Sequence, residues 1–294
     1  MFFRETSINS YGVGKKIDLY DKNLKYITSF DKLDDKIAYI KELWDGKILV
    51  IDLKKTIKIL KLNNNIITLE STIETADERN FVGFGTTNQN IICGGNRYLT
   101  IIGRSYLFWY KMIQSLDLEG FISNIVEIDS KSFLVGQNHK KRIIMFSSEN
   151  FKKLYGINNI SFRGNNYSIA KISNKFVGIA GFERGEKIKA CIFLLSLETK
   201  NICKKYYSDE LDNFCVLSRL SNTEIIITGN DIGTKDHSSN LNILNINGNS
   251  NNEEIKKISE LKDAFCDSVE AMITIKNLII AADSSSNLKL FQVE

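Results

Sequence analysis

The chain has 294 residues, of which 43% are hydrophobic and 25% charged, and its formal net charge is +4. This composition is that of a globular protein with a sizeable core, and the mild charge gives no argument for nucleic-acid binding, which favours a stronger and clustered basic excess. Two histidines, and five cysteines without a CxxC pair, disfavour both a zinc site and a disulfide framework.

The amino-terminal stretch MFFRETS meets charged residues early and has no apolar core, so we expect no signal peptide. No apolar run approaches the roughly 20 residues that a membrane helix requires. Each cysteine lies within or beside an apolar stretch, which indicates reduced and buried thiols. We therefore expect a cytoplasmic protein in a reducing compartment.

One strand-like run, rich in apolar residues and followed by a polar turn, recurs along the chain. The spacing between copies, about 37 to 50 residues, is close to the ~40–45 residues of a four-stranded propeller blade. The copies lie at residues 17–21, 57–62, 106–112, 143–147, 191–197, 241–246 and 288–293.

Companion strands surround most copies in a constant order, which we name A, B, C and D, with the recurring run as C. Strand B is the most apolar, as expected of a central strand buried on both faces, and D is the most polar, as expected of an edge. Residues 251–265 fit either a D strand or a short amphipathic helix. The B strands are expected at residues 47–53, 90–96, 132–138, 175–182, 224–231 and 277–283, and the A strands at 37–43, 81–87, 122–128, 167–173, 214–220 and 269–275.

In strand order and spacing the chain resembles the WD-repeat family over nearly its whole length. Tyr20-Asp21 stands where the family has Trp-Asp, the family's Gly-His dipeptide is absent, and Trp44-Asp45 falls in an A–B turn. The resemblance implies an all-β fold, a single β-propeller domain of four-stranded antiparallel blades over residues 1–294. Seven blades are expected, with six as the alternative, because residues 1–32 supply only strands C and D with an extra strand near residues 2–8. The approximate units are 1–32, 33–73, 74–118, 119–158, 159–208, 209–263 and 264–294.

The sequence offers little for catalysis. No P-loop, GxGxxG, GxSxG or HExxH motif occurs, and no local sequence places a nucleophile beside His139 or His237. No calcium-loop pattern is present. We expect no catalytic residue, no metal and no cofactor, and hence no enzyme.

The resemblance also implies that the B–C and D–A loops build one face. Basic residues that converge there would favour an acidic partner, whereas the alternative is a solvated rim. The candidate partner-binding residues are Lys54, Lys55, Arg97, Arg104, Lys140, Lys141, Arg142, Arg184 and Lys187.

A second resemblance is local. Phe162-Arg163-Gly164 is similar to the Phe-Arg-Arg-Gly motif of the phosphoinositide-binding propellers called PROPPINs, with one arginine instead of two, and implies a lipid-binding role for Arg163. The leading hypothesis is a non-enzymatic scaffold that presents loops to a protein partner with an acidic surface. The alternatives are a phosphoinositide-binding propeller with peripheral membrane association, and a small-ligand or enzymatic propeller.

Overall fold

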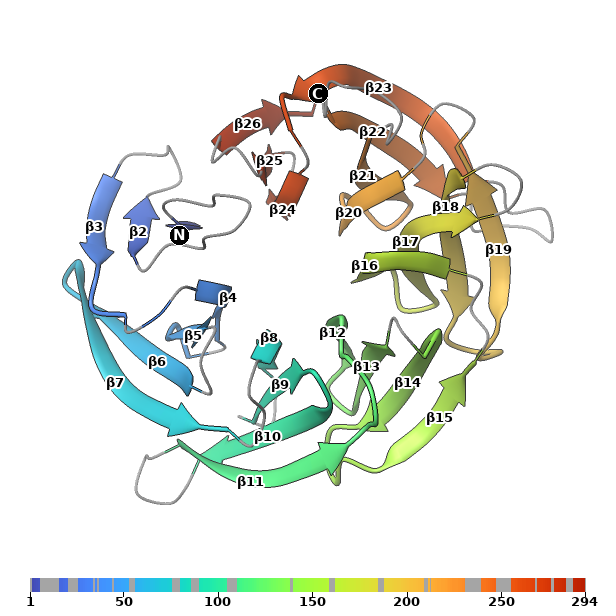
Figure 1. Cartoon of the computed structure of the whole chain (residues 1–294). Helices are drawn as coiled ribbons and strands as arrows, with labels where there is room; N and C mark the ends of the chain where they lie inside the picture. Colours follow the sequence, from blue (N-terminus) through green and yellow to red (C-terminus); the bar gives the residue numbers. More distant parts are fainter. Residues whose placement is uncertain are drawn as a thin grey trace. The chain divides into compact units, whose positions relative to one another are not determined.

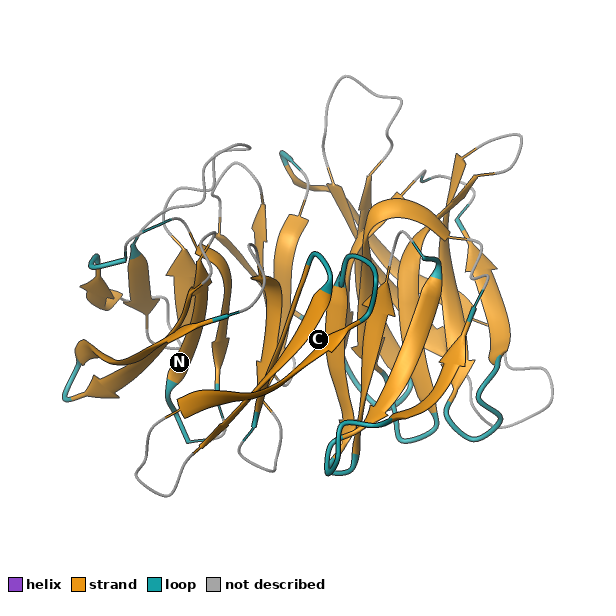
Figure 2. Cartoon of the chain, turned by 60° about the horizontal axis from the view of Figure 1, so that its bottom comes forward, coloured by secondary structure: helices purple, strands orange, loops and turns teal. Residues whose placement is uncertain are grey.

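The structure is a computed structural model, and every regular element that it describes is a β-strand (Figure 2). No helix in the described part of the chain is long and apolar enough to cross a membrane. The described residues are 2–5, 16–20, 26–33, 35, 37–43, 45–52, 56–75, 80–85, 90–104, 110–137, 140–158, 162–184, 188–208, 211, 213–230, 239–246, 255–267, 269–275, 278–283 and 288–293.

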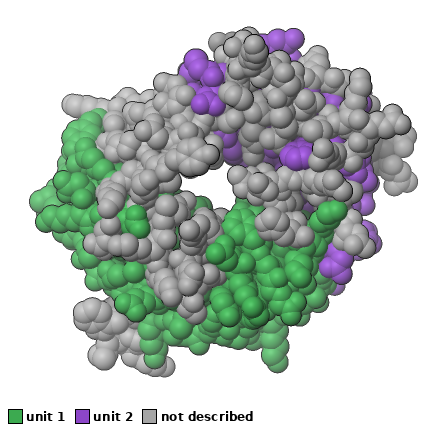
Figure 3. Space-filling model, viewed as in Figure 1, with its two compact units in different colours: residues 1–156 green, residues 157–294 purple. Residues whose placement is uncertain are grey.

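The described strands form seven antiparallel sheets, which we number in chain order (Figure 1). The chain divides into two compact units, Met1–Gly156 with the first four sheets and Ile157–Glu294 with the last three (Figure 3).

In the first unit, sheet 1 contains β1 (Phe2–Glu5), β2 (Ile17–Tyr20) and β3 (Tyr26–Phe30). Sheet 2 contains β4 (Ile37–Glu42), β5 (Ile48–Asp52), β6 (Thr56–Asn63) and β7 (Ile66–Glu74). Sheet 3 contains β8 (Asn80–Gly85), β9 (Ile91–Gly95), β10 (Tyr98–Arg104) and β11 (Tyr110–Asp117). Sheet 4 contains β12 (Asn124–Asp129), β13 (Ser132–Gln137), β14 (Arg142–Ser147) and β15 (Lys153–Ile157).

In the second unit, sheet 5 contains β16 (Phe162–Lys171), β17 (Phe176–Arg184), β18 (Ile188–Ser196) and β19 (Ile202–Tyr207). Sheet 6 contains β20 (Asn213–Arg219), β21 (Glu224–Asn230), β22 (Ser239–Ile246) and β23 (Ile255–Phe265). Sheet 7 contains β24 (Val269–Ile275), β25 (Leu278–Asp283) and β26 (Leu288–Gln292).

The predicted strand order is confirmed in six sheets, and it is wrong in one place. Residues 106–112 were expected to be the C strand of sheet 3, but that strand is β10, and Tyr110 already opens the D strand β11. Two apolar runs, residues 98–104 and 106–112, follow one another here. The run 98–104 pairs with β9 because the turn between it and β9 has only two residues, Asn96 and Arg97. Trp109 lies outside the described residues. The described part of 251–265 is the strand β23 rather than a helix.

The central B strands are buried because both of their faces pack against neighbouring sheets. All five residues of β5 are buried. Ile48 and Val50 join a hydrophobic cluster with sheet 1, whereas Leu49 and Ile51 join another cluster with sheet 3. Successive side chains of a strand point to opposite faces, so an unbroken apolar run is what such a position requires.

Glycines in the B strands allow close approach between neighbouring sheets. A Cβ atom on Gly94 would lie 2.4 Å from Cγ2 of Ile122, and one on Gly178 would lie 2.7 Å from Cδ1 of Ile172 and 2.8 Å from Cδ2 of Leu217. Glycine has a packing role at these two positions, because a larger side chain would collide with its neighbours.

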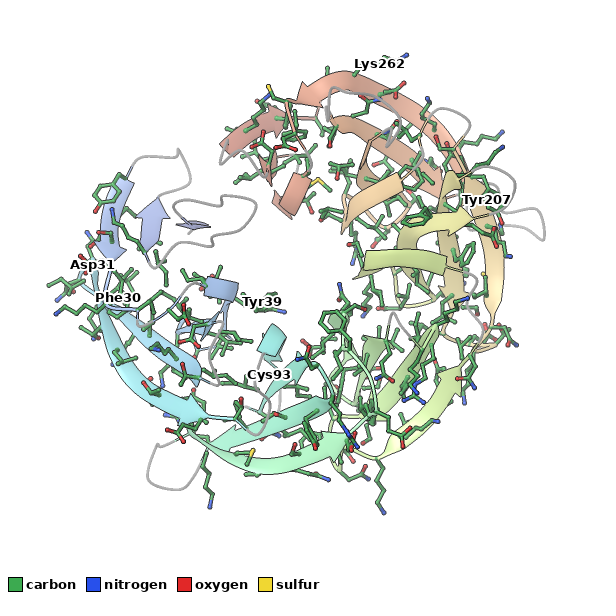
Figure 4. All side chains as sticks on the ribbon, in the orientation of Figure 1. Phe30, Asp31, Tyr39, Cys93, Tyr207 and Lys262 are labelled. Carbon is green, nitrogen blue, oxygen red and sulfur yellow. The ribbon has the colours of Figure 1, made fainter. Side chains whose placement is uncertain are left out.

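The outer D strands expose polar and apolar side chains to solvent. Tyr207 on β19 and Lys262 on β23 are labelled on the outer strands in Figure 4. Exposed large hydrophobic residues also occur there, including Ile66 and Leu69 on β7 and Ile258 on β23. Charged residues among them, such as Lys262, are typical of edges that resist pairing with other chains.

A buried ion pair stabilises sheet 2. Nζ of Lys58 lies 2.8 Å from Oδ2 of Asp52, and both side chains are almost completely buried. The hydroxyl of Thr56 donates a hydrogen bond of 2.5 Å to the same carboxylate oxygen and lies 3.2 Å from Nζ of Lys58. A buried charge needs such compensation, because an unpaired one is costly.

Candidate functional site

The best-defined site among the predicted basic residues surrounds the loop between β11 and β12. Backbone hydrogen bonds tie this loop to the neighbouring strands: the amide of Leu118 donates to the carbonyl of Arg97, and that of Ile122 to Gly95, both at 2.9 Å. The amide of Ser123 donates to Gly136 at 2.9 Å. The D–A loop of sheets 3 and 4 is thus held against the B–C turn of sheet 3 and strand β13.

Arg97 is held by a carboxylate on one side of this site. Its Nε lies 2.8 Å and 2.7 Å from the two carboxylate oxygens of Asp117, and its Nη2 contacts the same group. This hydrogen bond holds the pKa of Asp117 below its ordinary value and raises that of Arg97. Oδ1 of Asp117 also accepts the amide of Glu119 at 2.8 Å, and Glu119 has a φ of 57°, in the left-handed region.

Gln137 and Arg142 of sheet 4 also hold the β11–β12 loop in place by hydrogen bonds. The amide nitrogen of Gln137, which is fully buried, donates to the carbonyls of Leu118 at 3.1 Å and Gly120 at 2.8 Å. Arg142 donates from Nε to Oε1 of Gln137 at 2.5 Å and from Nη2 to the carbonyl of Leu118 at 2.6 Å. Both of these partners of the Arg142 guanidinium are neutral, so the contacts leave its positive charge at the site.

A cleft of about 260 Å³ opens between these elements, lined by Asn96, Arg97, Glu119 and Gly120. The Lys140 side chain lies against its wall, since a Cβ atom on Gly120 would be 3.1 Å from Cγ and 3.6 Å from Cε of Lys140. Glycine at residue 120 therefore leaves room for this lysine beside the cleft.

The cleft carries charges of both signs. Lys140 and Lys141 are exposed, and neither side chain has a hydrogen bond or ion pair with any residue that the structure describes. The carboxylate of Glu119 is likewise exposed and forms no hydrogen bond or ion pair among the described residues, although its charge helps to raise the pKa of Arg97. Lys140, in the turn between β13 and β14, thus packs against the β11–β12 loop that carries Glu119, beside Arg97, which is already paired with Asp117.

The remaining predicted basic residues do not join this site. Arg104 ends β10 at the opposite end from Arg97, where it pairs across the sheet with Tyr110, so the prediction that it shares the B–C edge is wrong. Arg142 opens the strand β14 instead of lying free in a loop. Arg163 lies near the start of the strand β16 and Arg184 ends β17, and the side chains of both lie outside the described part. Also outside the described residues are Lys54, Lys55, Lys187, His139 and His237.

Five residues of the site were missed by sequence reasoning. Gln137 carried a usable signal, because a polar residue that ends a fully buried strand needs hydrogen-bond partners. The others follow a strand or form a turn, where their types are ordinary. The missed residues are Asn96, Asp117, Glu119, Gly120 and Gln137.

A separate ionisable cluster lies between sheets 2 and 3. Nζ of Lys47 lies 3.3 Å from Oδ2 of Asp45, 2.8 Å from Oε2 of Glu70 and 5.2 Å from the ring centre of Tyr110. Burial favours the neutral amine of Lys47, but the hydrogen bond to Glu70 and the nearby acidic groups together raise its pKa. Because this lysine is neutralised by two carboxylates, the cluster joins two sheets rather than offering a free binding group.

No group of three or more His, Cys, Asp or Glu side chains that could hold a metal ion occurs among the described residues. The expectation of no metal concerns the whole chain and stays a prediction.

The comparisons place this fold among known structures. The chain is similar to a chain of the mitotic checkpoint complex, with a TM-score of 0.73, 13% identity and coverage of 95% of this chain and 82% of that one. It is also similar to a putative 6-phosphogluconolactonase from Bacteroides uniformis, with a TM-score of 0.75, 10% identity and coverage of 99% and 91%. For Kuenenia stuttgartiensis hydrazine synthase the TM-score is 0.65, the identity 9% and the coverage 83% and 72%. The all-β, multi-sheet fold fits a β-propeller.

No known family profile matches the chain, and no curated protein is similar to it in sequence. One similar structure belongs to a protein complex, and two carry the names of enzymes. The leading hypothesis of a non-enzymatic protein scaffold was therefore wrong, since the similar structures support the alternative of a small-ligand or enzymatic propeller better.

Proposed function

We propose that the chain is a propeller that binds a small polar ligand, and that the cleft beside the β11–β12 loop is the binding site. The observation that carries the proposal is a cleft with Glu119 in its lining and the Lys140 side chain close beside it, next to a loop that side-chain and backbone hydrogen bonds hold in place. Neither Lys140 nor Glu119 forms an ion pair with a residue that the structure describes. Ligand sites typically combine such a preformed concave surface with a few polar groups that fix orientation.

The groups that line the cleft, together with Lys140 beside it, favour a small zwitterion such as a free amino acid. Lys140 offers an ammonium to a ligand carboxylate, Glu119 offers a carboxylate to a ligand ammonium, and the amide of Asn96 both donates and accepts. At about 260 Å³ the cleft is smaller than the roughly 300–1,000 Å³ typical of drug-sized ligands, which supports a small molecule.

We propose further that this ligand is bound without chemical conversion. The described residues around the cleft bring no hydroxyl or thiol nucleophile next to a general base, and catalysis of acyl or phosphoryl transfer needs such a pair or a metal. The enzyme names of two similar structures describe those proteins, whose identity to this chain is only 9–10%.

The proposal also covers the domain organisation, the number of blades and the cellular compartment. We propose a single WD-repeat-like domain over residues 1–294 with seven blades, one for each described sheet, in the reducing cytoplasm. The seven antiparallel sheets support seven blades over six. The free cysteines Cys93 and Cys191 support a reducing compartment because both are buried without a disulfide.

Thermal-shift and calorimetric titration with a panel of free amino acids tests the site, with inorganic phosphate and 6-phosphogluconate as comparison probes. We expect at least one amino acid to bind, and both Glu119→Gln and Lys140→Gln to weaken that binding by about tenfold or more, since 1.4 kcal/mol per lost charge contact is tenfold in affinity.

Lys61→Gln is the matched control, because Lys61 is exposed on β6 of the same unit, away from the cleft. Equal binding by the wild type and all three variants overturns the proposed site. Tight binding of phosphate or 6-phosphogluconate without amino-acid binding overturns the proposal that the ligand is a zwitterion.

A further inference from the structure

The second unit contains a larger cleft, which lies between the turn that joins β16 to β17 and the turn that joins β20 to β21. Its volume is about 370 Å³, and its lining includes Lys175, Phe176, Arg219, Asn222 and Ile246. Neither the sequence motifs nor the cleft beside the β11–β12 loop accounts for it.

The two turns have the same construction. Lys171-Ile172-Ser173-Asn174 in one corresponds to Arg219-Leu220-Ser221-Asn222 in the other. The hydroxyl oxygen of Ser173 accepts the amides of Lys175 and Phe176 at 3.2 Å, and that of Ser221 accepts the amide of Thr223 at 3.2 Å.

Backbone bonds close each turn as well. The amide of Ile172 donates to the carbonyl of Phe176 at 3.0 Å, and that of Leu220 to Glu224 at 3.0 Å. Serine side chains that hold the backbone in this way stabilise tight turns, so the walls of the cleft are preformed.

Arg219 is fixed in place without losing its charge. Its Nε donates to the carbonyl of Ser221 at 3.1 Å, and its Nη2 donates to the amide oxygen of Asn222. Both partners are neutral. Within the described part of the chain, neither Arg219 nor the exposed Lys175 forms an ion pair with a carboxylate. The cleft therefore presents two cations, one of them oriented in advance.

The other side of the cleft is apolar. Ile172 and Ile246 are 1% and 4% exposed and belong to the hydrophobic cluster between sheets 5 and 6, and Phe176 is half-buried beside them. The amide of Ile246 donates to the carbonyl of Thr223 at 2.6 Å, which fixes this wall to the second turn. Apolar walls with a few convergent polar groups are typical of sites for small organic molecules.

We propose that this cleft binds a small organic anion with an apolar body, of the aryl or alkyl phosphate or carboxylate class. The anionic group lies between Arg219 and Lys175, and the apolar body lies on Phe176 and Ile246. Arginine suits planar or multidentate recognition of such oxyanions, and lysine adds a flexible point charge. The apolar wall distinguishes this ligand from an inorganic anion, which has no surface to bury there.

Calorimetric titration of the whole chain with phenyl phosphate tests the proposal, with phenol and inorganic phosphate as separate arms. We expect phenyl phosphate to bind at least about tenfold more tightly than either. Lys175→Gln should weaken binding several-fold without changing the melting temperature, because the Lys175 side chain has no hydrogen bond within the described residues. Arg219→Gln should weaken it more, and Arg219→Lys should recover part of the loss.

Lys262→Gln is the matched control, since Lys262 is exposed on the outer strand β23 of the same unit (Figure 4). Undetectable phenyl phosphate binding, or equal binding in wild type and Lys175→Gln, overturns the site. Inorganic phosphate or phenol that binds as tightly as phenyl phosphate overturns the ligand class. Glu119→Gln should leave phenyl phosphate binding unchanged, which separates this proposal from the one for the first unit.

Discussion

The guanidinium of Arg142 donates a hydrogen bond of 2.6 Å to the carbonyl oxygen of Leu118, 24 residues earlier in the chain. This bond joins the first residue of β14 to the loop that follows β11, and Gln137 completes the connection. A residue expected to be a free surface cation is therefore part of the support of the candidate site.

Arg142→Ala should destabilise the protein by about 1.5–3 kcal/mol, the usual contribution of hydrogen bonds to a charged group. Lys140→Ser and Lys141→Ser should each stay within about 0.5 kcal/mol of wild type, because both side chains are exposed and unpaired among the described residues. Urea denaturation monitored by fluorescence measures all three. Equal stability of the three variants would show that the hydrogen bonds of Arg142 to Leu118 and Gln137 contribute nothing to the stability of the fold.

Asp52→Ala should destabilise the protein by about 3–5 kcal/mol, because it removes the carboxylate that the buried Lys58 ammonium contacts at 2.8 Å. The double variant Asp52→Leu/Lys58→Met should recover most of that loss by replacing the pair with apolar side chains. A double-mutant cycle from denaturation curves gives the coupling between the two residues. Additive losses in the double variant would contradict a compensated pair.

The bond from Arg97 predicts a specific acid dependence. The pKa of Asp117 is lower in the folded protein than in the unfolded chain, where it is near 3.8. The ionised carboxylate therefore stabilises the fold fully at pH values above the unfolded pKa, and this contribution disappears as the pH falls through the lower, folded pKa. Asp117→Asn should therefore flatten the loss of melting temperature on acidification below about pH 5. Asp31→Asn, at an exposed carboxylate beside β3, is the control (Figure 4). Parallel pH profiles for wild type and Asp117→Asn would refute the assignment.

Gly178→Ala should destabilise the second unit by about 1–3 kcal/mol, since the new methyl group would collide with Ile172 and Leu217. Ile172→Val removes the Cδ1 atom that lies closest, so the double variant should regain part of the stability. Gly156→Ala serves as a control because its nearest neighbour is the flexible end of Lys153, at 3.3 Å. Calorimetric melting compares the three, and an unchanged melting temperature for Gly178→Ala would show that the sheets can move apart freely.

Cysteine reactivity should follow burial. Burial raises the pKa of the Cys191 thiol to about 12 and that of the fully buried Cys93 further, so little reactive thiolate forms at either at neutral pH. Cys203 and Cys266 are exposed, which corrects the expectation that every thiol is buried. Iodoacetamide under native conditions should modify Cys266 and Cys203 many-fold faster than Cys93 and Cys191, as peptide mass spectrometry would measure. Rapid labelling of Cys93 would mean that the core of sheets 2 and 3 opens readily.

Most of the strands could be predicted from the sequence because their apolar pattern has a local cause. The apolar stretch of residues 48–51 in β5 requires burial on both faces, and the more polar β7 suits an edge. Sheet 3 was harder, because two apolar runs compete and the pairing depends on the short turn at Asn96 and Arg97. Periodicity alone does not distinguish which of two adjacent apolar runs forms a given strand.

The candidate sites were less predictable. The sequence pointed to Arg97, Lys140 and Arg142, but not to their roles, which depend on the partners that the fold supplies. Asp117 neutralises Arg97, and no described residue neutralises Lys140. The guanidinium of Arg142 is bound to the carbonyl of Leu118. Such differences arise from contacts 20 or more residues apart, which no local pattern contains.

Each of the hydrophobic clusters among the described residues is shared by two sheets that follow one another in the sequence, as Ile48 and Leu49 show on opposite faces of β5. A chain built in this way depends mainly on nearest-neighbour interfaces, as repeat proteins do. Evolution can therefore lengthen or shorten it by whole sheets, provided that the new neighbours present matching faces. The equivalent Ser-Asn turns at Ser173 and Ser221 lie at the same place in two consecutive sheets, as such a repeat predicts, and the cleft between them is made by both copies together.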